Sequence, residues 1–292
     1  GWQGRIVRLR LDPTTQQGAN VTIAYIRGLG ALPAALEVAS FGAAVALPRA
    51  GEPFTVQAVA VNQGDQPAES AGLRLDAPAG VTVTGDATAS FAAVQPGAAI
   101  TGTWSVSADP GAHTLGLSVD GQRLAQALVI AEDPTGAELA LSGDNVRLRF
   151  TDHSFGYGPA TLEWRSGDDW QVAGRLRSFG TLIYLAEDGT ERQAAFFAPE
   201  MAADPAGGWL EADARHTDGD LTWRLTARFE RSDAGPWLTA TYTLAANRPA
   251  QLLAWTGPEL YVGEGQAGYR RDSALFPGLE FLTGDELSSG TD

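Results

Sequence analysis

The chain contains no cysteine, no lysine and only three histidines. The absence of cysteine excludes disulfides, thiolate zinc sites and thiol nucleophiles. His113, His153 and His216 are far apart in the sequence and none lies in a G-x-S-x-G motif, so neither a serine–histidine triad nor a histidine-ligated metal is indicated. All 20 basic residues are arginine, a bias that codon usage in a GC-rich genome explains more simply than function does.

Long apolar runs and excess positive charge are missing as well. The 292 residues include no signal peptide and no apolar run long enough to span a membrane. The net charge of −15 and the pI near 4.5 oppose binding to nucleic acid or to an anionic membrane, because both require a basic face. We therefore expect neither partner. The chain begins at Gly1 without a methionine, and we interpret it as an internal fragment or a processed form.

The residues that are present form short alternating runs separated by turns. Hydrophobic residues make up 44% of the chain, which is enough for globular cores. Leu221–Phe229 alternates strictly between apolar and polar residues, as a strand with one buried and one solvated face does. Trp223 lies on the apolar side of this run and is predicted to belong to the core. No long segment keeps a helical period, so we predict an all-β, multi-domain fold.

The length of the strand-like runs and the content of proline and tryptophan change along the sequence and divide the chain into three parts. Residues 1–32 hold two strand-like runs, too few to bury a core alone. Residues 33–132 hold short runs punctuated by prolines and by turns such as Asp120-Gly121, which predicts an immunoglobulin-like antiparallel sandwich. The polar, turn-forming stretch Glu132–Gly136 is the predicted boundary. Residues 137–292 hold six of the eight tryptophans and longer runs, which predicts a large antiparallel β-sandwich.

Two parts of the first half resemble known families. In residues 1–32, Trp2-x-Gly4, Leu9 to Pro13 (LRLDP) and Val21 to Arg27 (VTIAYIR) resemble the last strands of jelly-roll sugar-binding modules from secreted glycoside hydrolases. In residues 33–132, the order VNQGDQPA, LDAPAGVTV, VQPG and a TW strand resembles the immunoglobulin-like NPCBM-associated and CARDB modules of bacterial glycosidases and adhesins. The second resemblance implies that residues 33–132 act as a spacer.

The third part, residues 137–292, has a layout similar to that of a further family. The stretches YGPATLEWR, YLAEDGT and GPELYVGEG resemble the mutarotase-like supersandwich domains that flank catalytic barrels in carbohydrate-active enzymes. Together the three resemblances imply an accessory, carbohydrate-binding region of a secreted bacterial polysaccharide-degrading enzyme. The expected location is extracellular or at the cell surface. The expected partners are a polysaccharide or oligosaccharide and further domains of the same polypeptide.

Sugar recognition requires flat aromatic faces with polar groups at the edge of the sugar ring. Trp170 follows Gly167-Asp168-Asp169 and Trp209 follows Gly207-Gly208, so both are expected beside loops, where they could stack on a sugar. The stretch Trp255–Leu282 is rich in aromatic and charged residues, and its predicted loop could rim a cleft shared with another domain. The candidate ligand-binding residues are therefore Trp170, Trp209, Glu264, Tyr269, Arg270, Arg271, Asp272 and Glu280.

No complete catalytic constellation is evident. Glycoside hydrolysis requires two carboxyl groups placed on either side of the scissile bond. The acids that the C-terminal part offers for this are Glu259, Glu264, Asp272, Glu280, Asp285 and Glu286, but a sequence does not give their separations. We assign no catalytic residue. We expect no turnover by this chain alone, and we expect its parent protein to be a glycoside hydrolase.

Acidic turns raise the question of a structural calcium ion. Asp168-Asp169, Asp218-x-Asp220 and Gly143-Asp144-Asn145 carry the hard oxygen ligands that calcium prefers. The same residues are ordinary turn formers, and no complete D-x-D-x-D-G loop occurs. We therefore expect no cofactor, with structural calcium as the alternative.

Two other functions remain open at this point. One is a glycoside hydrolase or polysaccharide lyase fragment whose site lies in the last 40 residues. The other is a cell-surface adhesion or scaffold protein built from similar sandwiches. Binding to glycans and release of saccharides distinguish all three.

Overall fold

The computed structural model describes residues 32–204, 206–232, 235, 237–263, 273–276 and 280–283. These residues form strands, turns and loops with no helix, so the predicted all-β fold is confirmed. Within this part of the chain, no helix is long and apolar enough to cross a membrane. The predicted jelly-roll strands in residues 1–31 lie outside the described residues.

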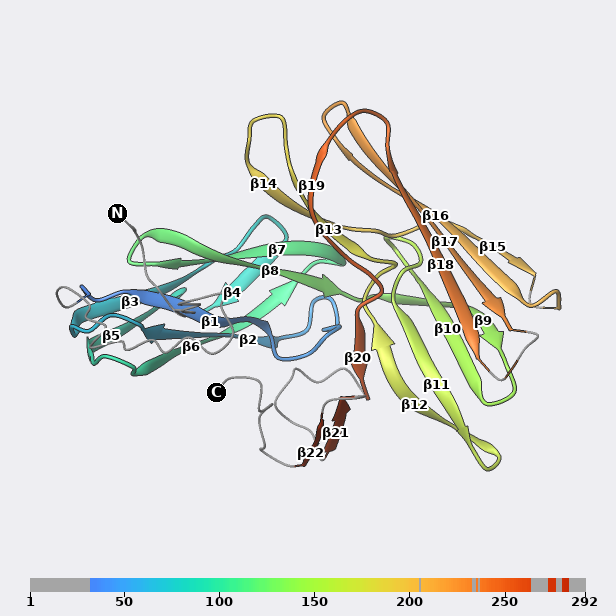
Figure 1. Ribbon diagram of the computed structural model, residues 1–292, viewed down its shortest axis with the longest axis horizontal. Helices are drawn as coiled ribbons and strands as arrows, with labels where there is room; N and C mark the ends of the chain where they lie inside the picture. The colour runs from blue at the N-terminus through green and yellow to red at the C-terminus, as the bar shows by residue number, and fades with distance from the viewer. Residues whose placement is uncertain are drawn as a thin grey trace, which may run out of the picture.

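The first sandwich consists of two four-stranded antiparallel sheets (Figure 1). We name each sheet after one of its strands: the β2 sheet has the order β1-β2-β6-β4 and the β7 sheet the order β5-β3-β7-β8. Its core forms because each strand turns alternate residues inward, as Val56, Ala58 and Ala60 on β2 do. The strands are β1 (Leu36–Ala43), β2 (Phe54–Asn62), β3 (Ala68–Asp76), β4 (Val81–Thr84), β5 (Thr88–Val94), β6 (Ala99–Ala108), β7 (Gly111–Val119) and β8 (Gln122–Ala131).

A buried asparagine fixes the end of this sandwich. The Asn62 amide donates to the carbonyls of Gln66 and Val94 at 2.9 and 3.0 Å, and its Oδ1 accepts from the Gly64 amide at 3.0 Å. The side chain is fully buried, and these bonds satisfy its polar atoms in place of water. A Cβ on Gly64 would lie 2.0 Å from the Pro33 carbonyl oxygen, so the turn requires glycine there.

The second sandwich is built from three sheets that enclose one core. The β11 sheet has the order β20-β12-β11-β10-β9, the β13 sheet β14-β13-β19 and the β17 sheet β15-β16-β17-β18. The strands are β9 (Pro134–Ser142), β10 (Val146–His153), β11 (Ala160–Ser166), β12 (Asp169–Leu176), β13 (Thr181–Leu185), β14 (Glu191–Ala195), β15 (Met201–Asp204), β16 (Trp209–Asp218), β17 (Leu221–Arg231), β18 (Leu238–Ala246), β19 (Gln251–Thr256) and β20 (Leu260–Val262). A separate hairpin pairs β21 (Ser273–Phe276) with β22 (Glu280–Thr283).

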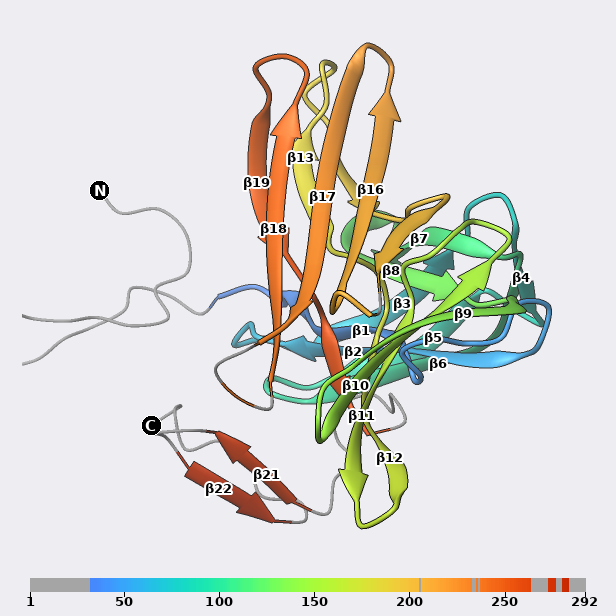
Figure 2. The same ribbon diagram turned by 90° about the vertical axis from the view of Figure 1, so that its right-hand side faces the viewer.

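Two chain segments connect the β11 sheet directly to the β13 sheet. β12 leads into β13 through residues 177–180, and β19 leads into β20 through the cis Gly257–Pro258 bond. Because β12 pairs with β20 and β13 pairs with β19, the two sheets form one bent layer opposite the β17 sheet. Figure 2 shows the β16, β17 and β18 strands of that opposing layer side by side.

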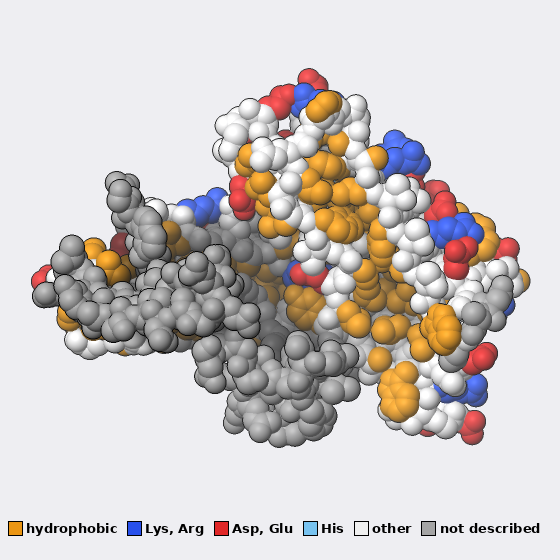
Figure 3. All heavy atoms as spheres, viewed as in Figure 1, with side chains coloured by type: hydrophobic (Ala, Val, Ile, Leu, Met, Phe, Trp, Pro, Cys, Tyr) orange, Lys and Arg blue, Asp and Glu red, His pale blue; other side chains and the backbone are white. Residues whose placement is uncertain are grey.

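The core of the second sandwich follows the alternation of β17. Leu221, Trp223, Leu225, Ala227 and Phe229 are all buried, so the prediction that Trp223 belongs to the core is confirmed. The core is less covered toward the edge strands β18 and β19, where apolar side chains gather on the surface (Figure 3). Leu252 and Leu253 of β19 are 41% and 43% exposed.

Charged contacts join the two sandwiches where β8 leads into β9. The Arg177 guanidinium donates to the Leu128 carbonyl at 3.0 Å, and Arg175 donates to the Glu132 carboxylate at 2.9 Å. Leu128 and Ile130 lie on the outer face of the β7 sheet and are 7% and 0% exposed, although outward-facing strand residues are ordinarily solvated. The second sandwich therefore covers this end of the β7 sheet.

The two faces of β17 should respond very differently to truncation. Leu225→Ala removes a fully buried side chain, and we expect it to lower the free energy of unfolding of the second sandwich by about 2–5 kcal/mol. Thr226→Ala changes the next residue, which faces outward, and should cost about 1 kcal/mol or less. Denaturant unfolding followed by tryptophan fluorescence measures both. Equal losses would contradict the assignment of the two faces.

His153 should make stability depend on pH. Burial lowers the pKa of its imidazole, and its Nδ1 accepts the Asp133 amide N–H at 3.1 Å, so the folded protein favours the neutral ring. The unfolded chain then binds more protons than the folded one once the pH falls below the ordinary histidine pKa of about 6.5, and folding loses stability there. We expect the melting temperature to fall between pH 7 and pH 5, and His153→Gln to reduce that slope. An unchanged slope in His153→Gln would contradict this role.

Candidate functional site

The outer face of the β17 sheet carries a ladder of charged side chains. On β16, Leu210, Ala212 and Ala214 point into the core, so Glu211, Asp213 and Arg215 point outward between them. The register places Glu211 opposite Arg228 and Arg215 opposite Arg224 on β17. The outward face of a single sheet therefore presents acids and arginines on adjacent strands.

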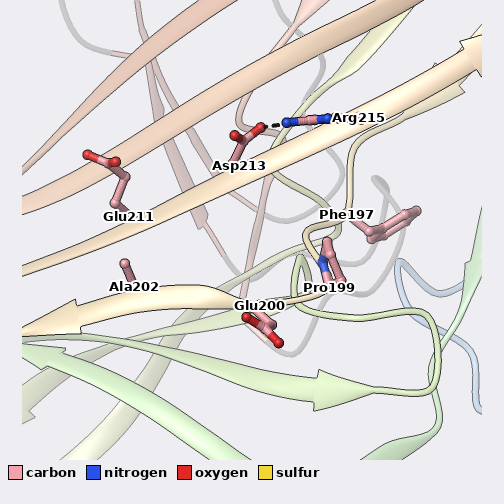
Figure 4. Close-up of a pocket in the computed structure, with 7 residues that line it drawn as sticks. All are labelled: Phe197, Pro199, Glu200, Ala202, Glu211, Asp213 and Arg215. Carbon is pink, nitrogen blue, oxygen red and sulfur yellow. Dashed lines mark ion pairs between the residues drawn. The ribbon is translucent and has the colours of Figure 1, made fainter.

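A hollow of about 670 Å³ lies beside this ladder. It exists because the short strand β15 places the small Ala202 directly opposite Glu211. Figure 4 shows Glu211, Asp213 and Arg215 along one strand and Ala202 along its neighbour, with Glu200 close by. Phe197 and Pro199, from the segment that precedes β15, form the apolar part of the lining.

A glycine positions Phe197 at this hollow. Gly156 has a φ of +96°, and a Cβ at that position would lie 2.4 Å from the Ala198 carbonyl oxygen. The close approach allows Tyr157 to pair with Ala198, with amide-to-carbonyl distances of 2.7 and 2.8 Å. Phe197 then packs edge-on against Phe155 at a centroid distance of 4.8 Å. A residue other than glycine at position 156 would disturb this contact.

Arginines contact the two carboxylates of the ladder on β16, Glu211 and Asp213. Arg224 donates to both oxygens of Asp213, and these hydrogen bonds are the largest cause of the lowered pKa of Asp213. Arg228 donates to Glu211 at 3.0 Å and to Glu230 at 2.9 Å. The site therefore offers hydrogen-bond acceptors that arginines hold in place.

Trp209 begins β16 at one end of the ladder. The Arg228 guanidinium lies 4.6 Å from its ring centroid, so one face of the indole is already in contact with a cation. The preceding loop is closed by the Gly207 amide, which donates to Asp204 Oδ1 at 2.8 Å. Trp209 is half-buried and lies on the same face of the strand as Glu211. Trp209 is not itself a lining residue of the hollow, but among the predicted site residues with described side chains it is the one that shares a strand face with Glu211 and Asp213.

Trp170 lies in a similar setting on a different sheet. The Arg147 guanidinium is 4.6 Å from its ring centroid, and Arg147 also donates to Glu163 at 2.6 Å. Glu163 is only 5% exposed although it is charged, and its hydrogen bonds and ion pairs with Arg147 and Arg149 hold its pKa low against the opposing effect of burial. Trp170 therefore lies at the end of an ion-pair network on the β11 sheet.

Most of the C-terminal candidates lie in parts of the chain that the structure does not describe. Glu264, Tyr269, Arg270, Arg271 and Asp272 lie outside the described residues, and Glu280 is described only as the first residue of β22. Glu259, one of the candidate acids, is bound instead by the Arg177 guanidinium, at 3.0 Å from Nε. The residues predicted from the sequence thus fall on several separate parts of the chain.

The acidic turns have local partners. Asp218 accepts a hydrogen bond from Tyr184 at 2.9 Å and pairs with Arg192, and Asp168 lies 3.9 Å from Arg165. Among the residues that the structure describes, no group of three or more His, Cys, Asp or Glu side chains is placed to hold a metal ion. Structural calcium on these turns stays a prediction.

Sequence reasoning missed most of the residues around the hollow. Glu200, Ala202, Glu211, Asp213 and Arg215 carry no motif, and the alternation around them indicates only which face each occupies. If exposure alone selected the tryptophans that stack on a sugar, the choice would not be Trp170 and Trp209. Trp164 and Trp237 are 47% and 53% exposed, whereas Trp170 and Trp209 are half-buried. What the sequence did indicate was the polar face of the neighbouring strand β17.

Comparisons with known proteins bear mainly on the first sandwich. Residues 49–119 match the family described as NPCBM-associated, NEW3 domain of alpha-galactosidase. This part of the chain is therefore similar to a β-sandwich module associated with carbohydrate-active enzymes, as its resemblance to the NPCBM-associated modules implied. No curated protein matches the sequence. Among solved structures, the alkylpurine DNA glycosylase AlkC of Pseudomonas fluorescens, bound to DNA containing an abasic site analog, aligns with a TM-score of 0.26 at 15% identity. The match covers 34% of this chain and 30% of that one, and so low a score carries no argument.

The Asp213–Arg224 contact can be tested by titration. We expect Arg224→Gln to raise the pKa of Asp213 toward its ordinary value, because the strongest hydrogen bonds to its charged form are lost. Arg215→Gln should raise it less, since Arg215 Nε lies 3.7 Å from the carboxylate. Carbon-detected NMR of labelled aspartate side chains measures both values. A larger shift in Arg215→Gln would contradict the geometry.

Proposed function

We propose that this chain is an accessory, glycan-binding region of a secreted bacterial polysaccharide-degrading enzyme. The match of residues 49–119 to a module named for alpha-galactosidase supports the association with carbohydrate-active enzymes. Under this proposal the chain is joined to further domains of the same polypeptide, and the ligand is a polysaccharide or oligosaccharide. The chain itself holds the glycan and does not cleave it.

The observation that carries the glycan-binding part is the hollow beside Trp209 on the β17 sheet. A pyranose ring presents apolar C–H groups on its faces and hydroxyl groups at its edge, so its site combines aromatic surface with fixed polar groups. Phe197 lines the hollow and Trp209 lies on the same strand face as Glu211, so these two rings supply the aromatic surface, and the carboxylates of Glu211 and Asp213 accept from hydroxyls. Trp209, Glu211 and Asp213 all lie on β16, and a strand holds such groups more rigidly than a loop would.

The electrostatics of the same hollow favour binding over turnover. A glycosidase needs one carboxylic acid that keeps its proton at working pH, which requires a raised pKa. Asp213 shows the opposite, because its pKa is lowered by Arg224, and Glu211 lies 3.0 Å from the Arg228 guanidinium. An ionised Asp213 suits hydroxyl recognition and does not suit the donation of a proton to a leaving group.

Removal of Trp209 tests the proposal. In affinity electrophoresis against a panel of soluble polysaccharides that includes galactomannan, xylan and glucans, we expect the wild-type chain to be retarded by at least one member. Trp209→Ala should weaken that interaction at least tenfold, because stacking surface is lost, and Glu211→Gln should weaken it less. The absence of reducing-end release by the wild-type chain is expected in the same samples.

Trp170→Ala is the matched control. It removes a tryptophan that is also half-buried and also covered by an arginine, but that lies on the β11 sheet. Its affinity should stay near that of the wild type. Binding that is lost in Trp170→Ala and kept in Trp209→Ala would move the site to the β11 sheet. A wild-type chain that binds no member of the panel would overturn the proposal in favour of an adhesion or scaffold role.

A further inference from the structure

A second pocket shares lining residues with the hollow on the β17 sheet. Phe197 and Arg215 line both, and the second pocket, of about 380 Å³, lies against the first sandwich. The two pockets are therefore neighbours. Together their lining residues extend from the outer face of the β17 sheet to the junction of the sandwiches.

The far wall of the second pocket belongs to the immunoglobulin-like sandwich. Ala112 and Thr114 on β7 and Leu128 on β8 line it. Thr114 and Leu128 are register partners on the outer face of the β7 sheet, which is the end of the sheet that the second sandwich covers. The side of the pocket formed by the second sandwich includes Gln193 and His216.

The position of this wall is fixed by contacts close to the pocket. Leu128 lines the pocket, and its carbonyl accepts from Arg177 at 3.0 Å. The amide of Glu132, immediately after β8, donates to the Pro48 carbonyl at 2.8 Å, and the Glu132 carboxylate accepts from Arg175 at 2.9 Å. The two walls are therefore tied together by hydrogen bonds as well as by the peptide chain.

The second pocket offers neutral hydrogen-bonding groups together with one cation. Tyr184 donates its hydroxyl proton to Asp218 at 2.9 Å, so His216 Nε2, at 3.1 Å from the same hydroxyl, is the donor in that contact. His216 Nδ1 is then an acceptor, and burial lowers the pKa of the ring so that it stays neutral. The Gln193 amide and the Thr114 hydroxyl add donors and acceptors beside Phe155. Hydroxyl groups of an uncharged sugar match this set.

We propose that the two pockets are consecutive subsites for one neutral oligosaccharide chain, and that the immunoglobulin-like module forms a wall of the second subsite. This inference rests on the proposed function, and it assigns a ligand-contacting role to a module whose resemblance implies a spacer. It also places Thr114, Gln193 and His216 among the ligand-contacting residues. Longer oligosaccharides then bind more tightly than short ones, because only they reach both subsites.

The test compares short and long ligands on the intact chain. The probes are the disaccharide, tetrasaccharide and hexasaccharide of the manno-, xylo- and cello-oligosaccharide series, measured by isothermal titration calorimetry. For the series that binds, we expect the hexasaccharide to bind at least tenfold more tightly than the disaccharide. Thr114→Trp fills the second subsite from the first sandwich and should reduce the hexasaccharide affinity to that of the disaccharide. Its disaccharide affinity should match that of the wild type.

Two further variants test the second subsite independently of Thr114→Trp. Thr114→Ser retains the hydroxyl and should preserve the dependence on length. Gln193→Ala removes a polar group from the opposite wall and should weaken hexasaccharide binding several-fold, even if Thr114→Trp fails to fold. If the affinity of Thr114→Trp and Gln193→Ala still rises with oligosaccharide length as in the wild type, the inference is overturned. The proposed function would still stand in that case, provided that Trp209→Ala loses binding. If no probe binds and the polysaccharide panel also fails, both are overturned.

Discussion

The Arg177 guanidinium is the contact on which the arrangement of the two sandwiches depends most. It donates to the Leu128 carbonyl of the first sandwich and to the Glu259 carboxylate beside the bend of the second, and it lies 5.1 Å from the Tyr261 ring centroid. The side chain is 11% exposed, and a guanidinium that deeply buried is tolerated only when its charge and its N–H groups are matched. Because these partners come from β8 and from the β20 segment, and Arg177 itself follows β12 directly, one residue holds three elements together. The wall formed by β7 and β8 reaches the second sandwich as a result.

The same alternation that builds the core of the second sandwich also builds its candidate site. On β16 and β17 every second residue is buried, so the residues between them form a continuous outer row. A row of arginines alone would repel itself, as Arg215 and Arg224 lie directly opposite each other. Asp213 relieves this by contacting both guanidinium groups, and Glu211 and Glu230 do the same for Arg228. Side chains that are paired in this way lose less freedom when a ligand binds.

Particular residues show how much of the fold and of the candidate site the sequence alone could predict. Leu221–Phe229 was predicted as a strand with Trp223 inside, and the structure confirms both, because strand periodicity decides which face a residue occupies. The hollow could not be predicted in the same way. It requires Ala202 to lie opposite Glu211, and that register depends on the turn between β15 and β16 and on tertiary packing. The second pocket is harder still to predict, since it brings Thr114 together with residues about 40 to 100 positions later in the sequence. The C-terminal candidates were chosen for their composition, which gives no spatial information.

The distribution of charge explains why a neutral ligand suits this surface better than an anionic one. The chain carries 35 acidic residues against 20 arginines, so its long-range field repels anions. Within the ladder, however, the charges nearly balance, because Glu211, Asp213 and Glu230 face Arg215, Arg224 and Arg228. An anionic sugar would have to compete with these carboxylates for their arginines while also approaching an acidic protein. A neutral sugar does not compete for the arginines and is not repelled by the acidic protein. Its hydroxyl groups can donate to carboxylates that remain paired with arginine, because a carboxylate keeps free lone pairs after one arginine contact.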